Sequence, residues 1–285
     1  MNIESLRERL TRRTLWFSLL FLFVILPAQA AWAQGSVLFY NRYTSDETGA
    51  DTRITMTNTS WYNSVTVHLF AVDGNTCSVA DSFLTLGRGQ SASFYASHYD
   101  PGVSGYLVAV ATRNGLPVRH NYLTGVASIY DHGKYAQLSA VPAQRLSNAA
   151  NVVNDGATDL LFNGVMYEKL PGAVALTSYS DPAETDLYLY SPAMDLRTGD
   201  DSTISVFGLI YGQYGGTLST STHIRCYMRV PLTGLRAVGG LPRNGWLRLS
   251  ANRPLLGAGI GPYGGSNLTP LSYLSGKITI PVFAW

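Results

Sequence analysis

The sequence predicts an all-β protein in which two antiparallel β-sandwich domains, Ig-like or jelly-roll-like, follow an N-terminal signal peptide. Three observations point to this fold. Apolar and polar residues alternate along short segments, turn-forming residues punctuate these segments every ~8–12 residues, and no long segment has the apolar period of a helix. Because 46% of the 285 residues are hydrophobic and only 13% are charged, we expect a packed rather than a disordered chain.

Residues 1–33 have the pattern of an export signal. A basic start with four arginines precedes the apolar run 15–26. The tripeptide 31–33 then places alanine on both sides of a tryptophan, which suits a signal peptidase. We therefore expect cleavage between Ala33 and Gln34, with an uncleaved membrane anchor as the alternative.

Removal of this leader changes the charge balance. Residues 1–33 carry four of the 20 basic and two of the 18 acidic side chains, so 16 of each remain and the net charge becomes zero. A neutral chain without a basic cluster lacks the electrostatic features of nucleic-acid or anionic-membrane binding. We expect no nucleic-acid partner, membrane contact only through an uncleaved leader, and a location that is secreted, at the cell surface or periplasmic.

The first predicted domain, residues 34–130, has the clearest β pattern. An apolar run at 37–40 opens it, and Asn114-Gly115 separates the runs 106–111 and 117–123. Both central residues of a type I′ turn have positive φ, which asparagine and glycine tolerate, so this pair predicts a β-hairpin. Other predicted strands cover residues 53–57, 65–70, 83–86 and 92–95.

The pattern weakens at 131–157, which we interpret as a linker, and resumes in the second predicted domain, 158–285. There Asn163-Gly164 is a second hairpin signal, with 165–167 as the expected partner strand. Further predicted strands cover residues 173–176, 187–190, 204–211, 223–230, 246–249, 255–260 and 278–283.

The sequence contains no recognisable catalytic constellation. Residues 102–105 resemble a nucleophile elbow but lack one spacer residue, and no histidine pair has metal-ligand spacing. The acidic loop 195–201 contains Arg197, which favours a solvated turn over a Ca²⁺ site. No pair of carboxylates stands out for glycoside cleavage. We expect a protein that is not an enzyme and that has no cofactor and no metal ion.

The two cysteines, Cys77 and Cys226, lie in different predicted domains. An oxidising compartment would permit a disulfide between them, whereas a core of this size does not require one. Because the sequence does not give the distance between their Cα atoms, a bridge and two free thiols both remain open.

Aromatic residues make up 12% of the chain and recur near turns. Tyrosine and tryptophan combine an apolar face with a polar tip, which suits protein and carbohydrate partners, although most of them pack within sheets. Trp61 and Tyr62 stand out because they lie in the polar turn 58–64, where a core position is unexpected. We therefore predict a contact patch at Trp61 and Tyr62.

The last strand permits an alternative fold. Thr279, Pro281, Phe283 and Trp285 share one strand face, and an aromatic final strand is common in outer-membrane β-barrels. Pro281 weakens this interpretation because proline cannot donate a hydrogen bond within a ladder. The barrel is retained as an alternative.

Residues 54–59, 65–70 and 105–111 resemble strands in the Ig-like β-sandwich modules of exported bacterial surface proteins, and 245–250 with 254–257 are similar to strands of the same proteins. The resemblance implies the fold and the location, and it brings no catalytic residue. The expected function is that of a secreted or cell-surface structural or adhesive protein that contacts a protein, a glycan or a second copy of itself. A carbohydrate-binding module that uses exposed aromatic side chains is an alternative.

Overall fold

The computed structural model describes residues 33–45, 49–199, 202–235 and 240–283. The predicted all-β class is confirmed, because these residues form 22 strands and two 3₁₀ turns, η1 (Ala96–His98) and η2 (Leu232–Gly234). No helix within the described ranges is long and apolar enough to cross a bilayer. The predicted leader lies outside the described residues except for Ala33, which is exposed and precedes the partly exposed Gln34.

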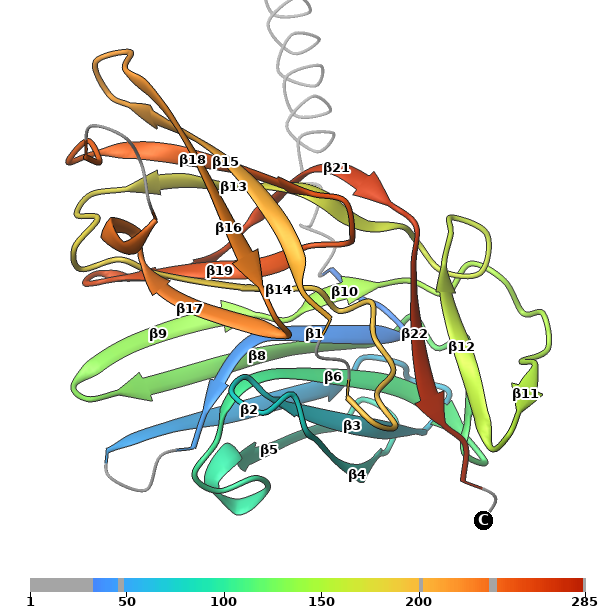
Figure 1. Ribbon diagram of the computed structural model, residues 1–285. Helices are drawn as coiled ribbons and strands as arrows, with labels where there is room; N and C mark the ends of the chain where they lie inside the picture. Colours follow the sequence, from blue (N-terminus) through green and yellow to red (C-terminus); the bar gives the residue numbers. More distant parts are fainter. Residues whose placement is uncertain (1–32, 46–48, 200–201, 236–239, 284–285) are drawn as a thin grey trace, which may run out of the picture. The chain divides into compact units, whose positions relative to one another are not determined.

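Two sheets are built mainly from the first half of the chain (Figure 1). Sheet I has the order β10-β1-β6-β3-β4, with β7 paired to β6. Its strands are β1 (Val37–Thr44), β3 (Val65–Asp73), β4 (Val79–Leu86), β6 (Ser104–Arg113), β7 (Leu116–Pro117) and β10 (Val141–Ala143). Sheet II, of order β5-β2-β8-β9, contains β2 (Ala50–Asn58), β5 (Ser91–Tyr95), β8 (Leu123–Asp131) and β9 (Lys134–Ser139).

Three further sheets come from the second half. Sheet III, of order β17-β14-β19-β20, contains β14 (Asp186–Tyr190), β17 (Tyr227–Pro231), β19 (Leu256–Gly261) and β20 (Gly264–Asn267). Sheet IV, of order β16-β15-β18-β13-β21, contains β13 (Leu170–Tyr179), β15 (Ile204–Gly212), β16 (Thr217–Ile224), β18 (Gly245–Ala251) and β21 (Thr269–Leu274). Sheet V, of order β11-β12-β22, contains β11 (Val153–Asn154), β12 (Ala157–Phe162) and β22 (Gly276–Pro281).

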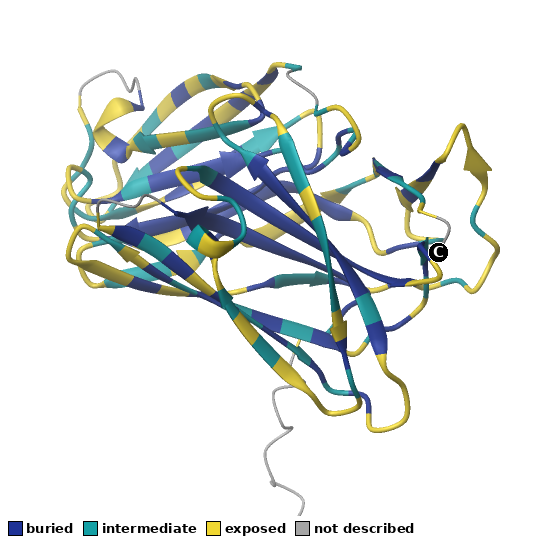
Figure 2. Cartoon of the chain, turned by 90° about the horizontal axis from the view of Figure 1, so that it is seen from below, coloured by how far each residue is buried: buried dark blue, intermediate teal, exposed yellow. Residues whose placement is uncertain are grey.

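Sheet I is covered on both faces, which explains its continuous apolar runs. Every residue of β1 is buried. One face of sheet I packs on Ile54 and Met56 of sheet II, and the other packs on Leu160 and Phe162 of sheet V. In sheet II, by contrast, buried and less buried residues alternate along β2, so its second face meets solvent (Figure 2).

The two halves share their apolar cores. Tyr188 and Ile260 of sheet III belong to the core between sheets I and II, while a separate core fills the space between sheets III and IV. Residues 34–285 accordingly form one compact unit. The stretch 131–157, expected as a linker, supplies β9 to sheet II, β10 to sheet I and β11 to sheet V, because its scattered small apolar residues fit short edge strands.

Buried polar groups also join the halves, at a seam that we define by Asn41, Arg42, Asp131, Tyr190 and Gly257. The Asn41 amide donates to the carbonyl of Gly257 over 2.8 Å and accepts from the Tyr190 hydroxyl over 2.8 Å. The Arg42 guanidinium pairs with the Asp131 carboxylate of β8 and lies over the ring of Tyr188 in the second half, 4.2 Å from the ring centroid. Although burial opposes ionisation, hydrogen bonds from His132 and Arg42 lower the pKa of Asp131 to about 2.

The two asparagine–glycine signals have different outcomes. Asn114 and Gly115 have φ values of 50° and 74° and connect the paired strands β6 and β7, which confirms the hairpin, but the partner strand is Leu116–Pro117 alone and not the expected 117–123. Asn163 and Gly164 also form a turn, but the expected partner strand at 165–167 is wrong, because β12 pairs with β11 and β22 instead.

Candidate functional site

Trp61 and Tyr62 lie in the loop that connects β2 to β3. Their exposed fractions are 78% and 84%. Large aromatic side chains are normally at least half buried, so two adjacent exposed rings call for a physical explanation. We call residues 59–64 the aromatic loop.

Asn58, at the end of β2, fixes the shape of the aromatic loop from below. Its side chain is fully buried, and its amide nitrogen donates to the carbonyls of Asn63 and Gly87 over 2.8 and 2.9 Å. Its amide oxygen accepts from the backbone N–H of Ser60 over 3.0 Å. One side chain thus ties both ends of the loop to the neighbouring β4–β5 turn, since each buried polar atom has a partner.

The Ser60 side chain continues this network into the loop. The Ser60 hydroxyl accepts from the backbone N–H groups of Tyr62 and Asn63 over 3.3 and 3.1 Å. The Ser60 carbonyl accepts from the backbone N–H of Gly89 over 2.9 Å. The backbone on both sides of Trp61 is therefore held by hydrogen bonds, while its side chain points outward.

His120 completes the base of the aromatic loop. Its Nε2 lies 2.9 Å from the Asn58 amide oxygen, which is an acceptor, so Nε2 carries the proton and donates. Burial, together with the charge of Arg113, lowers the pKa of His120. Burial thus favours the neutral imidazole, which keeps the Nε2–H that donates to Asn58.

Gly89 provides a surface for the Trp61 ring. It has a φ of +60°, and a Cβ atom at this position would lie 3.2 Å from Cζ3 of Trp61. The tryptophan thus approaches the backbone of the β4–β5 turn closely and leaves its remaining surface to solvent. The exposed side chain of Arg88 precedes this glycine in the same turn. An aromatic surface with a cation nearby suits stacking on a sugar ring or packing against a protein side chain.

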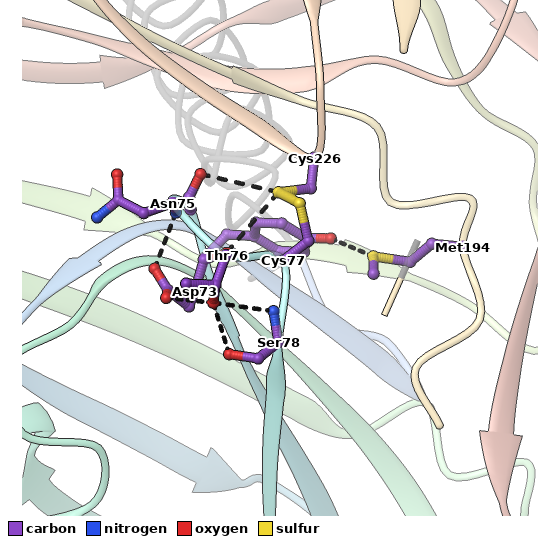
Figure 3. Close-up of a disulfide and its surroundings, with 9 residues drawn as sticks. Asp73, Asn75, Thr76, Cys77, Ser78, Met194 and Cys226 are labelled. Atoms are coloured by element: carbon purple, nitrogen blue, oxygen red, sulfur yellow. Dashed lines mark hydrogen bonds between the residues drawn. A yellow bond between two sulfur atoms is a disulfide. The ribbon is translucent and has the colours of Figure 1, made fainter. Parts of the chain in front are cut away.

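Cys77 and Cys226 form a disulfide with a Cα–Cα distance of 5.7 Å (Figure 3). It joins the β3–β4 turn of sheet I to the segment between β16 and β17. Asp73 shapes this turn, because its carboxylate accepts from the backbone N–H of Asn75 over 2.8 Å. In Figure 3 the Thr76 and Ser78 side chains point toward each other beside the bridge, consistent with their 2.7 Å hydrogen bond.

His68, which is fully buried, supports the fold rather than an open site. Its Nε2 lies 2.8 Å from the Asp81 carboxylate, and its ring stacks on Phe83 with centroids 4.1 Å apart. Burial lowers the pKa of His68, although the hydrogen bond to Asp81 acts in the opposite direction.

The acidic loop that begins at Asp195 contains an ion pair, in which the Arg197 guanidinium lies 2.7 Å from the Asp195 carboxylate. Among the described residues no three His, Cys, Asp or Glu side chains are grouped as a metal site would require.

A wide hollow lies beside sheet V, and no sequence pattern predicted it. Its volume is about 890 Å³, and its charged lining comprises Asp155, Asp159, Asp195, Arg197, Arg253 and Lys277. Lys277 lies 3.3 Å from Asp159, and Arg197 pairs with Asp195, so these charges already have partners. The lining residues are far apart in the sequence, which is why no motif revealed the hollow.

A second aromatic feature lies on the open face of sheet IV. The rings of Tyr211 and Trp246 are stacked, with centroids 3.8 Å apart and an interplanar angle of 7°. They belong to opposite positions of β15 and β18. Phe207, which lies four residues before Tyr211 on the same face of β15, is 49% exposed. The apolar pattern predicted strands at these residues but not a solvent-facing surface.

No protein-family model and no curated protein matches this chain. Weak similarity extends to a mutant of Bacillus subtilis oxalate decarboxylase, with 9% identity over 87% of this chain and 68% of that one, and a TM-score of 0.20. Vicilin from Capsicum annuum is 7% identical over 82% and 75% of the two chains, with a TM-score of 0.21. The formate complex of Lactobacillus farciminis oxalate decarboxylase is 8% identical over 87% and 77%, with a TM-score of 0.20. At such TM-scores these similarities carry no argument about function.

Proposed function

We propose that this protein is an exported structural or adhesive protein that binds other molecules at the cell surface through Trp61 and Tyr62 and has no catalytic activity. The observation that carries the proposal is the buried network of Asn58, Ser60 and His120 beneath two exposed aromatic rings. A loop held in one conformation loses little entropy when its aromatic side chains are covered by a partner. The network therefore supports a role in recognition.

Two features support the exported location. The first 33 residues have the composition of a signal peptide. The Cys77–Cys226 disulfide is the kind of bond that persists outside the reducing cytosol. We expect the N-terminal peptide of the exported protein to begin at Gln34 by mass spectrometry, whereas a peptide that begins upstream of residue 28 would contradict cleavage of the leader.

We further propose that each half is a two-sheet β-sandwich of Ig-like or jelly-roll-like type, with the two sandwiches fused along the seam. Sheets I and II, which face each other across a common core, support this for the first half. Sheets III and IV support it for the second half. In such folds binding residues commonly lie on the loops at one end of the sandwich, as Trp61 and Tyr62 do.

The binding proposal is tested with labelled protein on intact bacterial cells. The double variant Trp61→Ala/Tyr62→Ala should weaken binding by about tenfold or more, because buried aromatic anchors dominate interface energies. Its unfolding free energy should change by less than about 0.5 kcal/mol, since both side chains are exposed in the free protein.

The matched control is Tyr214→Ala/Tyr263→Ala, which removes two aromatic side chains that are each 93% exposed on turns of the second half. This control should bind like the parent protein. Equal weakening by both double variants, or by neither, would contradict a specific role for the aromatic loop. Prior protease treatment of the cells should abolish binding to a protein partner, whereas periodate should abolish binding to a glycan.

A carbohydrate-binding role is the second candidate, and the stacked Tyr211–Trp246 pair on the open face of sheet IV favours it. Hydroxyl side chains of β16, including Ser219 and Ser221, are exposed on the same sheet and supply hydrogen-bonding groups for a sugar. A glycan array decides between the surfaces: binding lost in Trp246→Ala and kept in Trp61→Ala would assign the sugar site to sheet IV.

A further inference from the structure

Sheet IV ends in a strand whose outer edge is open. β16 pairs with β15 and with no other strand in the described part of the chain, so its second side presents backbone N–H and C=O groups (Figure 1). Its eight residues contain no Asp, Glu, Lys, Arg, proline or glycine. Threonine and isoleucine favour extended backbone, so this edge is well suited to accept another strand.

The other edges of the five sheets are protected, within the ranges that the structure describes. Proline lies in five of these edge strands, a charged residue lies in two others, and the remaining three have five residues or fewer. These features are Pro117 in β7, Pro142 in β10, Pro231 in β17, Pro270 in β21, Pro281 in β22, Asp81 in β4 and Lys134 in β9, with β5, β11 and β20 as the short strands. Among the strands that the structure describes, β16 is therefore the one long edge without a feature that prevents strand pairing.

The face beside this edge is also suited to contact. Phe207 of β15 is half exposed and lies opposite Ser221 of β16, so an apolar side chain stands one strand inside the edge. β16 carries no Asp, Glu, Lys or Arg side chain that would face its own copy, and the chain without its leader has no net charge when histidines are counted as neutral. Neither short-range nor long-range repulsion therefore opposes pairing of identical edges.

We propose that two copies of this chain pair through β16, antiparallel and about a two-fold axis, so that their five-stranded sheets become one ten-stranded sheet. The pairing closes at two copies, because the opposite edge, β21, contains Pro270 and has irregular register with β13. The dimer does not depend on the aromatic loop, since Trp61 and Tyr62 belong to the first half of the chain.

The test is the mass of the purified protein by sedimentation between about 1 and about 100 µM. We expect a twofold rise in mass with concentration. Ser219→Lys/Ser221→Lys places two positive charges of each copy beside the paired edges, so the protein should stay monomeric. The matched control, Ser91→Lys/Ser93→Lys, adds the same charge to the edge strand β5 and should dimerise like the parent protein.

Hydrogen exchange provides a second measurement that needs no variant. The amides of β16 should exchange several-fold more slowly at the high concentration than at the low one, while those of β5 should not change. A parent protein that stays monomeric throughout, or a dimer that survives Ser219→Lys/Ser221→Lys with concentration-independent exchange in β16, would overturn the proposal.

Discussion

Asn41 and Asn58 are equally buried, and both ends of each side-chain amide are hydrogen-bonded, yet they connect different kinds of structure. Asn41 joins β1 to the Gly257 carbonyl and the Tyr190 hydroxyl in the other half of the chain. Asn58 joins three loops at one end of the first half, beneath Trp61 and Tyr62. The same buried group thus stabilises a closed seam in one place and a loop with exposed rings in the other.

The seam and the aromatic loop differ in whether the side chains beside the polar network are covered. We interpret the covered seam as a stabilising region and the uncovered loop as a binding region. At the seam, the network itself is buried between the two halves, since Asn41 and Tyr190 are exposed by 1% and 0%. At the aromatic loop, nothing in the described residues covers the two rings, so the polar network holds a surface that still has apolar area to bury. Breaking the seam should therefore affect global stability, whereas breaking the loop base should affect local order first.

The largest effect is expected from the disulfide that reinforces the seam. Replacement of both cysteines in Cys77→Ser/Cys226→Ser should lower the unfolding free energy by about 3–5 kcal/mol, since the bridge closes a long loop in the unfolded chain. Urea unfolding with and without a reductant measures this, and the reductant should have no effect on the double variant. A loss below about 1 kcal/mol would show that the seam holds without the bridge.

Asn41→Ala should lower the unfolding free energy by about 2–4 kcal/mol, because the Tyr190 hydroxyl and the Gly257 carbonyl would remain buried without this partner. Urea unfolding again gives the number. Asn75→Ala serves as the control, since Asn75 is exposed in the β3–β4 turn and its loss should change stability by less than about 0.5 kcal/mol.

Sequence reasoning anticipated the aromatic loop better than the seam, for physical reasons. Exposure of Trp61 and Tyr62 could be expected because turn-forming residues surround them, and that signal is local. The apolar run at 37–40 predicted a buried strand but not which sheets would cover its two faces, because the residues that cover one face, Leu160 and Phe162, lie more than a hundred positions away. Asn41 has no local signature, since its partners Tyr190 and Gly257 meet it only in the folded chain.

The hairpin signals show the same limit. Asn114-Gly115 succeeded because local φ preferences and strand pairing agreed, with β7 directly after the turn. Asn163-Gly164 made its turn, but β22 from the far end of the chain occupied one side of β12 and β11 the other. Local turn chemistry predicts that the chain reverses direction, whereas competition among distant strands decides which partner is taken.

Asn58→Ala should lower the unfolding free energy by about 1–3 kcal/mol, because the Gly87 carbonyl and the His120 Nε2 proton would lose their partner. Its distinguishing effect is local. Amides of residues 60–63 should exchange with solvent faster in this variant than in the parent protein, while in Asn41→Ala they should not. Unchanged exchange in Asn58→Ala would mean that Ser60 alone holds the loop.

The smallest expected effect is a difference between the aromatic loop and the seam in their response to mild acid. Because the pKa of His120 is lowered in the fold, the unfolded chain binds the proton more readily, and stability is lost as pH falls below about 6.5. Asp131 at the seam has a pKa of about 2, so its contribution is lost only as pH falls from about 4 toward 2.

Exchange in the aromatic loop should therefore quicken between pH 6.5 and 5, after correction for the intrinsic pH dependence of exchange, while the seam amides stay protected. His120→Gln keeps an N–H donor without a titrating group and should flatten the response of the loop. Residual acid sensitivity of global stability in that variant is expected from His68, whose pKa is also lowered. A loop response that persists unchanged in His120→Gln would place the acid-sensitive group elsewhere and remove His120 from the physical account of how the aromatic loop is held.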